Sequence, residues 1–156
     1  ENDRIVEIDL GSNNLRGTVP TELQHMPMLE RLHLPDNNIQ GTIPSEVGAL
    51  GRLTSLDLRS NSLRGTIPST LFGLKQLAFI QLQSNAISGQ IPNSIGNCTG
   101  LKVLMLTQNM LTGTLPSSIN DLVQLEEFVL DDNVGLCGPL PPFSSSTNLK
   151  RIFLGE

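Results

Sequence analysis

The sequence contains no tryptophan and no tyrosine, and phenylalanine occurs only five times in 156 residues. Aromatic side chains supply much of the buried contact area in many cores and recognition surfaces. Aliphatic side chains must therefore fill the interior of this protein. Any recognition surface must depend on the remaining candidates, which are Phe, Met, His and Arg.

Basic charge is also scarce. Ten Lys and Arg residues stand against fifteen Asp and Glu, which gives a net charge of −5, and charged residues make up only 16% of the chain. Nucleic-acid-binding domains present a basic patch, so nucleic acid is not an expected partner. No apolar run approaches the roughly 18 residues of a membrane-spanning helix. We therefore expect membrane attachment only through segments outside this chain.

The sequence does contain a repeat of 24 residues, in which an asparagine and a Gly-x-Ile/Val/Leu-Pro segment each return at a fixed position. A period of this length is typical of a solenoid, whose function lies on a repeated surface rather than in a central pocket. A Gly-x-Ile/Val/Leu-Pro segment begins at Gly17, Gly41, Gly65, Gly89 and Gly113. The asparagine ladder consists of Asn13, Asn37, Asn61, Asn85, Asn109 and Asn133. Apolar residues open the coils at Ile5, Leu29, Leu53, Leu77, Leu101, Leu125 and Leu149.

The third coil illustrates the predicted unit. Residues 53–58 end in alternating apolar side chains, which predicts a short strand that stacks into a parallel sheet with a spacing of about 4.8 Å. Asn61 ends that strand, and its amide can satisfy backbone groups of the turn. Gly65 to Pro68 predicts a turn with a short second strand. Ser69 is the expected N-cap of a brief helical turn over residues 70–74 on the outer side.

This pattern resembles the leucine-rich repeat family, L-x-x-L-x-L-x-x-N-x-L, and the continuation x-G-x-I-P-x-x-L/I-G-x-L resembles its plant-type subclass. In the second coil the residues that carry it are Leu32, Leu34, Asn37, Ile39, Gly41, Ile43, Pro44, Val47 and Leu50. The resemblance implies an α/β solenoid: a right-handed superhelix with a parallel β-sheet on the concave side. Short second strands at Gly-x-Ile-Pro and short 3-10 or helical turns on the convex side would complete each coil.

The resemblance covers residues 1–156, which we expect to form a single domain of about six and a half repeats, with starts at residues 5, 29, 53, 77, 101, 125 and 149. The amino-terminal cap usual in the family is missing, and the seventh coil stops before its ladder asparagine. Because solenoids need polar caps at both ends, this is either a piece of a longer chain or a chain with one end covered by another subunit.

Two cysteines and one irregular coil depart from the pattern. Cys98 and Cys137 lie two coils apart at different angular positions, so we expect no disulfide. Cys98 replaces a coil-end leucine and reads as a small buried apolar residue. In coil six, prolines and serines over residues 139–147 disfavour the outer helical turn. An extended loop is expected there, with Phe143 covering the core.

Side chains between the framework leucines alternate toward solvent, so the concave positions can be read from the sequence. They are mainly charged in the first coils and apolar in the later ones. Soluble proteins seldom leave an apolar patch without a use, although sequence outside this chain could also cover it. We predict a binding site whose anchors are Phe79, Val103, Met105, Val129 and Phe153. Its rim would comprise Arg59, Gln81, Gln83 and Asp131.

His33 is predicted to lie between Asp9 and Asp57 in one column, about 5 Å from each by strand spacing. Such neighbours favour the imidazolium, so contacts of His33 and Asp57 with a ligand would respond to pH near 6–7. One imidazole and two splayed carboxylates are weak evidence for a metal. A solvated charge cluster is the preferred interpretation, and neither a metal nor a cofactor is expected.

The sequon Asn97-Cys98-Thr99 permits N-glycosylation of a secreted chain, although a chance triplet explains it equally. A column of Thr18, Thr42, Thr66 and Thr114, interrupted by Gln90, is explained by β-propensity rather than by ice binding.

No catalytic constellation is present, because no serine or cysteine nucleophile has a base partner in the repeat frame. The chain is therefore interpreted as a non-enzymatic, secreted or cell-surface protein that binds a protein or peptide on its concave face. Members of the resembled family are mostly extracellular recognition modules, which favours a receptor-like ectodomain. Two alternatives remain: an inhibitor of a secreted wall-degrading enzyme, similar to the polygalacturonase inhibitors, and a docking scaffold within a larger complex.

Overall fold

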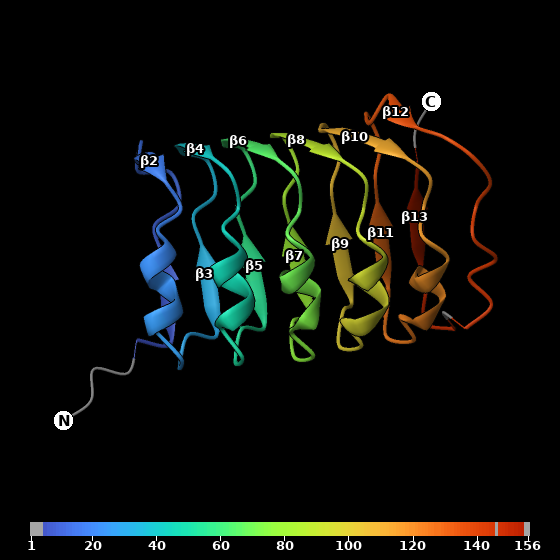
Figure 1. Cartoon of the computed structure of the whole chain (residues 1–156), viewed down its shortest axis with the longest axis horizontal. Helices are drawn as coiled ribbons and strands as arrows, with labels where there is room; N and C mark the ends of the chain where they lie inside the picture. Colours follow the sequence, from blue (N-terminus) through green and yellow to red (C-terminus); the bar gives the residue numbers. More distant parts are fainter. Residues whose placement is uncertain (1–4, 146, 155–156) are drawn as a thin grey trace.

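A computed structural model of the chain describes residues 5–145 and 147–154 (Figure 1). Each coil contributes one short strand to a seven-stranded parallel sheet, and neighbouring strands pair residues that are 24 positions apart. The first and last strands lie at opposite ends of the stack (Figure 1). The strands, in sheet order, are β1 (Glu7–Asp9), β3 (Arg31–His33), β5 (Ser55–Asp57), β7 (Phe79–Gln81), β9 (Val103–Met105), β11 (Glu127–Val129) and β13 (Arg151–Phe153).

A second parallel sheet runs along one edge of the stack. It comprises β2 (Arg16–Thr18), β4 (Asn38–Gly41), β6 (Ser62–Gly65), β8 (Ala86–Gly89), β10 (Met110–Gly113) and β12 (Gly135–Leu136).

We predicted these second strands at the Gly-x-Ile-Pro segment, but they lie earlier in each coil. In β4, β6, β8 and β10 the glycine is the last strand residue, because its φ of +77° to +81° turns the chain out of the sheet. A Cβ on Gly89 would also lie 2.8 Å from Cγ2 of Thr66 in the preceding coil. The glycine therefore ends the strand and allows close stacking, while the following isoleucine enters the core.

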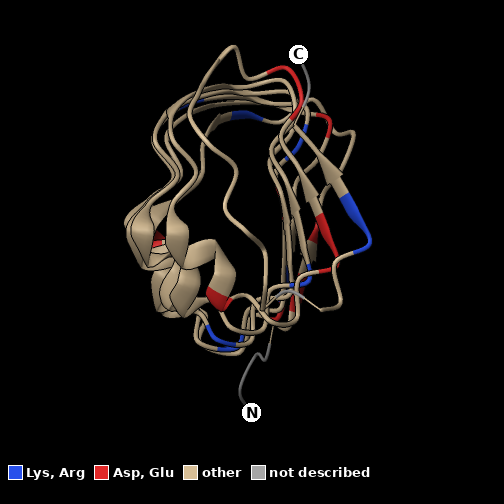
Figure 2. Cartoon of the chain, turned by 90° about the vertical axis from the view of Figure 1, so that its right-hand side faces the viewer, with Lys and Arg blue, Asp and Glu red and all other residues tan. Residues whose placement is uncertain are grey.

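The predicted short turns on the outer side are confirmed as 3-10 helices. Among the described residues there are five, which form the outer wall: η1 (Thr21–His25), η2 (Ser45–Ala49), η3 (Ser69–Gly73), η4 (Asn93–Asn97) and η5 (Ser117–Asp121). Viewed along the stack, this wall lies opposite the seven-stranded sheet, and the second sheet joins the two (Figure 2).

The expected N-cap role of Ser69 is wrong. Pro68 holds the cap position in an extended conformation, no side chain caps the helix, and Ser69 is already its first residue. Proline needs no hydrogen-bond partner for its nitrogen, which suits a helix start. The outer hydroxyls instead connect neighbouring coils: Thr70 Oγ1 donates to the Ser45 carbonyl at 2.8 Å, and Ser94 Oγ donates to the Ser69 carbonyl at 3.1 Å.

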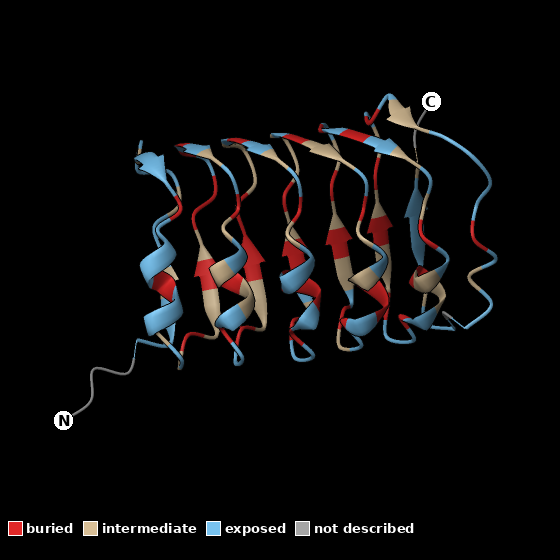
Figure 3. Cartoon of the chain, viewed as in Figure 1, coloured by how far each residue is buried: buried red, intermediate tan, exposed pale blue. Residues whose placement is uncertain are grey.

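Buried residues line the interior between these walls from coil to coil (Figure 3), and nearly all of them are aliphatic. Leu53, Leu77, Leu101 and Leu125 are completely buried, as are the strand leucines and isoleucines that stack on them. Burial of each such side chain contributes roughly 1.5–3 kcal/mol. One coil cannot bury these groups alone, so each coil depends on its neighbours for stability.

The asparagine ladder connects consecutive coils through backbone groups. Asn109 Nδ2 donates to the carbonyls of Leu82 and Leu106, both at 3.0 Å, and its Oδ1 accepts the N–H of Ile87 at 3.0 Å. Asn37, Asn61, Asn85 and Asn133 repeat this pattern. The prediction that these amides satisfy the turn backbone is confirmed, and the same bonds also fix the stacking of the coils.

Coil six departs from this scheme as predicted. Among the described residues between η5 and β13 there is no outer helix, Pro141 is buried, and Phe143 adopts a positive φ of 47°. The partly buried Phe143 ring packs against the core, with its centroid 6.1 Å from that of Phe128. An aromatic side chain from an extended loop thus closes the core where a helical leucine does so in the other coils.

Both cysteines are free, in agreement with the sequence prediction. Cys98 is buried, and its thiol donates to the Leu74 carbonyl at 3.3 Å, whereas Cys137 is exposed. Burial raises the pKa of the Cys98 thiol to about 12, so that it stays protonated and unreactive. Among the described residues, none of the helices has the length and apolar character needed to cross a membrane.

Candidate binding face

The solvent-facing side of the seven-stranded sheet, called the sheet face below, presents two columns of side chains in exact register with the predicted ones. The lower column consists of the first residue of each strand: Glu7, Arg31, Ser55, Phe79, Val103, Glu127 and Arg151. The upper column consists of the third residue of each strand: Asp9, His33, Asp57, Gln81, Met105, Val129 and Phe153. Because the strands are only three residues long, the residues just beyond their ends complete the face.

Five apolar side chains of these columns adjoin one another, and we call them the apolar strip. Phe79 pairs with Val103 in the lower column, while Met105, Val129 and Phe153 follow one another in the upper column. Val103 and Met105 belong to the same strand, β9, so the two parts are continuous. Phe79 is 42% exposed and Phe153 is 52% exposed, and the three side chains between them are half-buried. The predicted anchors therefore lie together.

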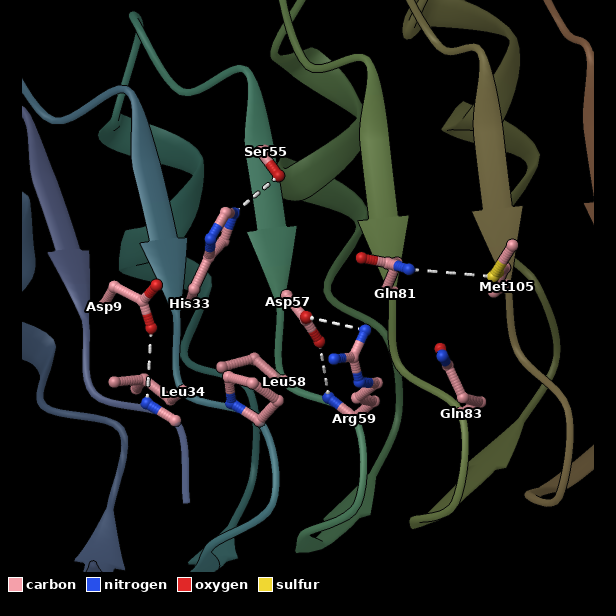
Figure 4. A network of polar contacts seen from close by, with 12 residues as sticks. Asp9, His33, Leu34, Ser55, Asp57, Leu58, Arg59, Gln81, Gln83 and Met105 are labelled. Atoms are coloured by element: carbon pink, nitrogen blue, oxygen red, sulfur yellow. Dashed lines mark hydrogen bonds and ion pairs between the residues drawn. The ribbon is translucent and has the colours of Figure 1, made fainter. Parts of the chain in front are cut away.

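The charged coils have a different arrangement, in which cations and carboxylates neutralise one another. Arg31 Nη2 lies 2.8 Å from Glu7 Oε2, and this hydrogen bond lowers the pKa of the Glu7 carboxyl. Arg59 Nη1 lies 3.1 Å from Asp57 Oδ2, and the Arg59 N–H donates to Asp57 Oδ1 at 3.2 Å (Figure 4). Desolvation nevertheless raises the pKa of Asp57, because its side chain is buried.

His33 has a different partner from the predicted pair of aspartates. Its Nε2 lies 2.8 Å from the hydroxyl oxygen of Ser55 (Figure 4). The Asp57 carboxylate turns instead toward Arg59, two residues beyond the end of β5. The predicted column is confirmed, because His33 pairs with Asp9 on one side and Asp57 on the other in the strand register. Asp9 also lies within 4.8 Å of the imidazole, whereas Arg59 binds Asp57 in place of His33.

One acidic residue outside the predicted pair, Glu7, also lies close to His33. Single ligand atoms of Glu7, Asp9 and His33 lie within 4.8 Å of one another. The Glu7 carboxylate is already bound to Arg31, and Asp9 Oδ1 accepts the Gly11 N–H at 3.3 Å. With His33 bonded to Ser55, all three groups are thus engaged on an open surface, which supports a charge cluster rather than a metal site. The sequence placed Glu7 only in the neighbouring column, so its closeness to His33 was not predicted.

Two glutamines lie between the charged coils and the apolar strip. Gln81 Nε2 makes only a long contact of 3.8 Å with Met105 Sδ. Gln83 Oε1 is buried and accepts no hydrogen bond within the described part of the chain. A buried acceptor without a donor costs about 1–3 kcal/mol. Burial of this oxygen depends on neighbouring side-chain positions, so sequence reasoning had no signal for it.

Asp131 and Asp132 follow β11 directly, beside Val129. Asp131 is half-buried and Asp132 is exposed, and neither has an ion pair with any described residue. The predicted rim residues thus differ in state: Arg59 is paired, the two glutamines have weak or absent contacts, and Asp131 is free to bind a cation.

The sequon residues Asn97 and Thr99 are both exposed, and Asn97 is the last residue of η4 on the outer wall. The side chain of Asn97 is therefore accessible, on the wall opposite the sheet face.

Comparison with known proteins agrees with this architecture. The model of the Leucine Rich Repeat family matches residues 4–26, 28–50, 52–74, 76–98 and 100–122. A search of the curated proteins gave no significant match.

Solved structures of plant receptors are similar to the chain. The leucine-rich repeat ectodomain of the plant membrane receptor kinase GASSHO1/SCHENGEN3 from Arabidopsis thaliana, in complex with CASPARIAN STRIP INTEGRITY FACTOR 2, is 39% identical with a TM-score of 0.85. The alignment covers 88% of this chain and 17% of that one. This chain therefore spans only about a sixth of that ectodomain's length.

Two complexes from Arabidopsis thaliana give similar values. A chain of the complex of the receptor kinase HAESA with the peptide hormone IDA and the co-receptor SERK1 is 35% identical, with a TM-score of 0.89 and coverage of 97% of this chain and 26% of that one. A chain of the BIR3–SERK2 complex is 34% identical, with a TM-score of 0.79 and coverage of 92% and 76%.

Proposed function

Because this chain belongs to the leucine-rich repeat family, we propose that it is a recognition module that binds a protein or peptide on its sheet face. The observation that carries this proposal is the apolar strip, in which Phe79 and Phe153 remain 42% and 52% exposed on a face that is otherwise polar. Solvent-exposed apolar surface of this kind is typical of interaction sites. Solved relatives in complex with a peptide hormone support the same kind of ligand.

The binding residues proposed are the five of the apolar strip, with Arg59, Gln81, Gln83 and Asp131 at its rim. His33 and Asp57 extend the site toward the charged coils. Their contacts with Ser55 and Arg59 hold them in place, so they would contribute shape and local charge more than direct hydrogen bonds.

The module acts without catalysis and outside the cell in this proposal, with residues 1–156 as one domain. Its similarity to ectodomains of plant membrane receptor kinases supports both the extracellular location and the absence of chemistry. Asn97 would carry an N-linked glycan. Since Asn97 lies on the outer wall, the glycan would leave the sheet face free.

Selection from a random peptide library tests the proposal, because no ligand need be known beforehand. The immobilised chain should select peptides that bind it, and their affinity should fall 10- to 100-fold for the double variant Phe79→Ser and Met105→Ser. Phe79 is exposed and Met105 is half-buried, and both lie outside the core, so the variant should stay folded with only a small loss of melting temperature. Val123→Ser, a change at an exposed apolar residue next to η5, is the matched control and should bind normally. Selected peptides that bind the double variant as well as the wild type would refute the proposal.

A further inference from the structure

The charges around the sheet face are unevenly satisfied, and this imbalance limits what the apolar strip can bind. Four of the five cations in or beside these strands have a carboxylate within 4.0 Å: Arg31 with Glu7, Arg59 with Asp57, Lys150 with Glu126 and Arg151 with Glu127. The fifth, Lys102, has no carboxylate at that distance among the described residues. Lys102, which precedes β9, also lowers the pKa of Glu126. The cations of this face are thus largely neutralised and have little attraction left for an acidic ligand.

The carboxylates beside the strip are in the opposite state. Asp131 and Asp132 follow β11 at the end nearest Val129, and no cation lies within ion-pair distance of either in the described chain. Asp131 is half-buried, which weakens its screening by solvent. Gln83 occupies the position of Asp131 two coils earlier and carries no charge. Among the described residues, the unpaired charges at the Val129 end of the strip are therefore negative.

We propose that the ligand of the sheet face is an extended peptide in which apolar residues lie on the apolar strip and a basic side chain binds Asp131 and Asp132. This rests on the proposed function and adds the chemistry of the ligand. The net charge of −5 favours such a peptide over an acidic one at long range as well.

Distances along the face fix the size of the recognised segment. The strands β7, which carries Phe79, and β11, which carries Val129, are two strand spacings apart, or about 10 Å. An extended peptide covers this distance in about three residues. The anchor over Phe79 and Val103 and the basic side chain at Asp131 should therefore be about three residues apart in the ligand.

Two capped synthetic peptides test the proposal directly: Phe-Leu-Gly-Lys-Lys-Gly and the same peptide with glutamine in place of both lysines. The intact chain should bind the lysine peptide about 3- to 30-fold more tightly, because each exposed ion pair contributes modestly. Raising the salt concentration should remove most of this difference. Equal affinity for the two peptides would overturn the inference.

Variants separate this inference from the proposed function. Asp131→Asn with Asp132→Asn should bring the lysine peptide to the affinity of the glutamine peptide, while Glu22→Gln with Glu46→Gln, which removes the same charge from η1 and η2, should change little. If Asp131→Asn with Asp132→Asn has no effect but Phe79→Ser with Met105→Ser abolishes binding, the basic side chain is refuted and the binding face stands. If neither double variant affects binding, both proposals are refuted.

Discussion

The first three coils and the later ones have the same interior and different surfaces. Leu56 and Leu104 are both completely buried in equivalent strands, and Asn37 and Asn109 make the same inter-coil hydrogen bonds. On the sheet face, Arg31 is paired with Glu7 in the early coils, whereas the equivalent position on β9 holds Val103. Stability therefore depends on the buried positions of the repeat and recognition on the solvent-facing positions. The recognition surface can change without loss of the fold.

The largest expected effect concerns the shared interior. Asn37→Ala and Asn109→Ala should each lower the free energy of unfolding by about 2–4 kcal/mol, because each leaves several buried backbone groups without partners. The two losses should agree within about 1 kcal/mol if both halves have the same framework. Urea unfolding followed by circular dichroism measures them. Asn13→Ala is the control and should cost less, since the Asn13 amide is exposed and donates only to the Gly11 carbonyl.

The surfaces should respond in the opposite way. Phe79→Ser with Met105→Ser should lower the affinity for a selected peptide 10- to 100-fold, equivalent to about 1.4–2.7 kcal/mol. Arg31→Ala, in the charged coils and outside the proposed site, should change that affinity less than about threefold. Isothermal titration calorimetry of the three proteins makes the comparison. A larger loss of affinity from Arg31→Ala than from Phe79→Ser with Met105→Ser would show that the peptide binds the charged coils rather than the apolar strip.

The strand-ending glycines should behave alike in both halves. Gly41→Ala and Gly89→Ala should each cost about 1–2 kcal/mol, because an L-residue is strained at φ of +81° or +77° and the new Cβ would meet Thr18 or Thr66 within 2.9 Å. Thermal unfolding measures both losses. Gly51→Ala is the control: its Cβ would point into open space without a positive φ, so its melting temperature should stay within the error or rise slightly.

The smallest effect distinguishes Asp57 from Gln81, its equivalent in the next coil. Burial raises the pKa of Asp57 in the folded protein above the ordinary value of 3.8. The protonated form is therefore favoured by folding, and this contribution is complete below pH 3.8 and is lost as the pH rises through the folded-state pKa. Asp57→Asn should thus gain stability relative to the wild type between pH 3 and pH 7. Unfolding curves at several pH values test this, and a relative loss over that interval would contradict it.

Much of this fold could be predicted from the sequence because the repeat fixes equivalent environments. The apolar column, the asparagine bonds and the loop closed by Phe143 all followed from position within the coil. The second strands were predicted too late in the repeat, because the positive φ of glycine ends a strand before the β-prone Thr-Ile pair. Ser69 was assigned as an N-cap because its side-chain type suits that role, although Pro68 occupies the position.

The candidate site was predictable in its columns and less so in its contacts. Strand alternation alone placed Phe79, Met105 and Phe153 on one face. It could not decide whether Asp57 would bind His33 or Arg59, since that choice depends on side-chain rotamers at the end of β5. For the same reason the isolated oxygen of Gln83 and the unpaired Asp131 emerged only from the structure.

Methyl NMR spectra of the chain titrated with a selected peptide test the central claim most directly, because they locate the ligand without any substitution. The account predicts shift changes at Val103, Met105 and Val129, with Val6 at the charged end of the sheet and Val123 next to η5 unaffected. Changes centred on Val6 or on Val123 would show that the ligand binds elsewhere and would contradict the account.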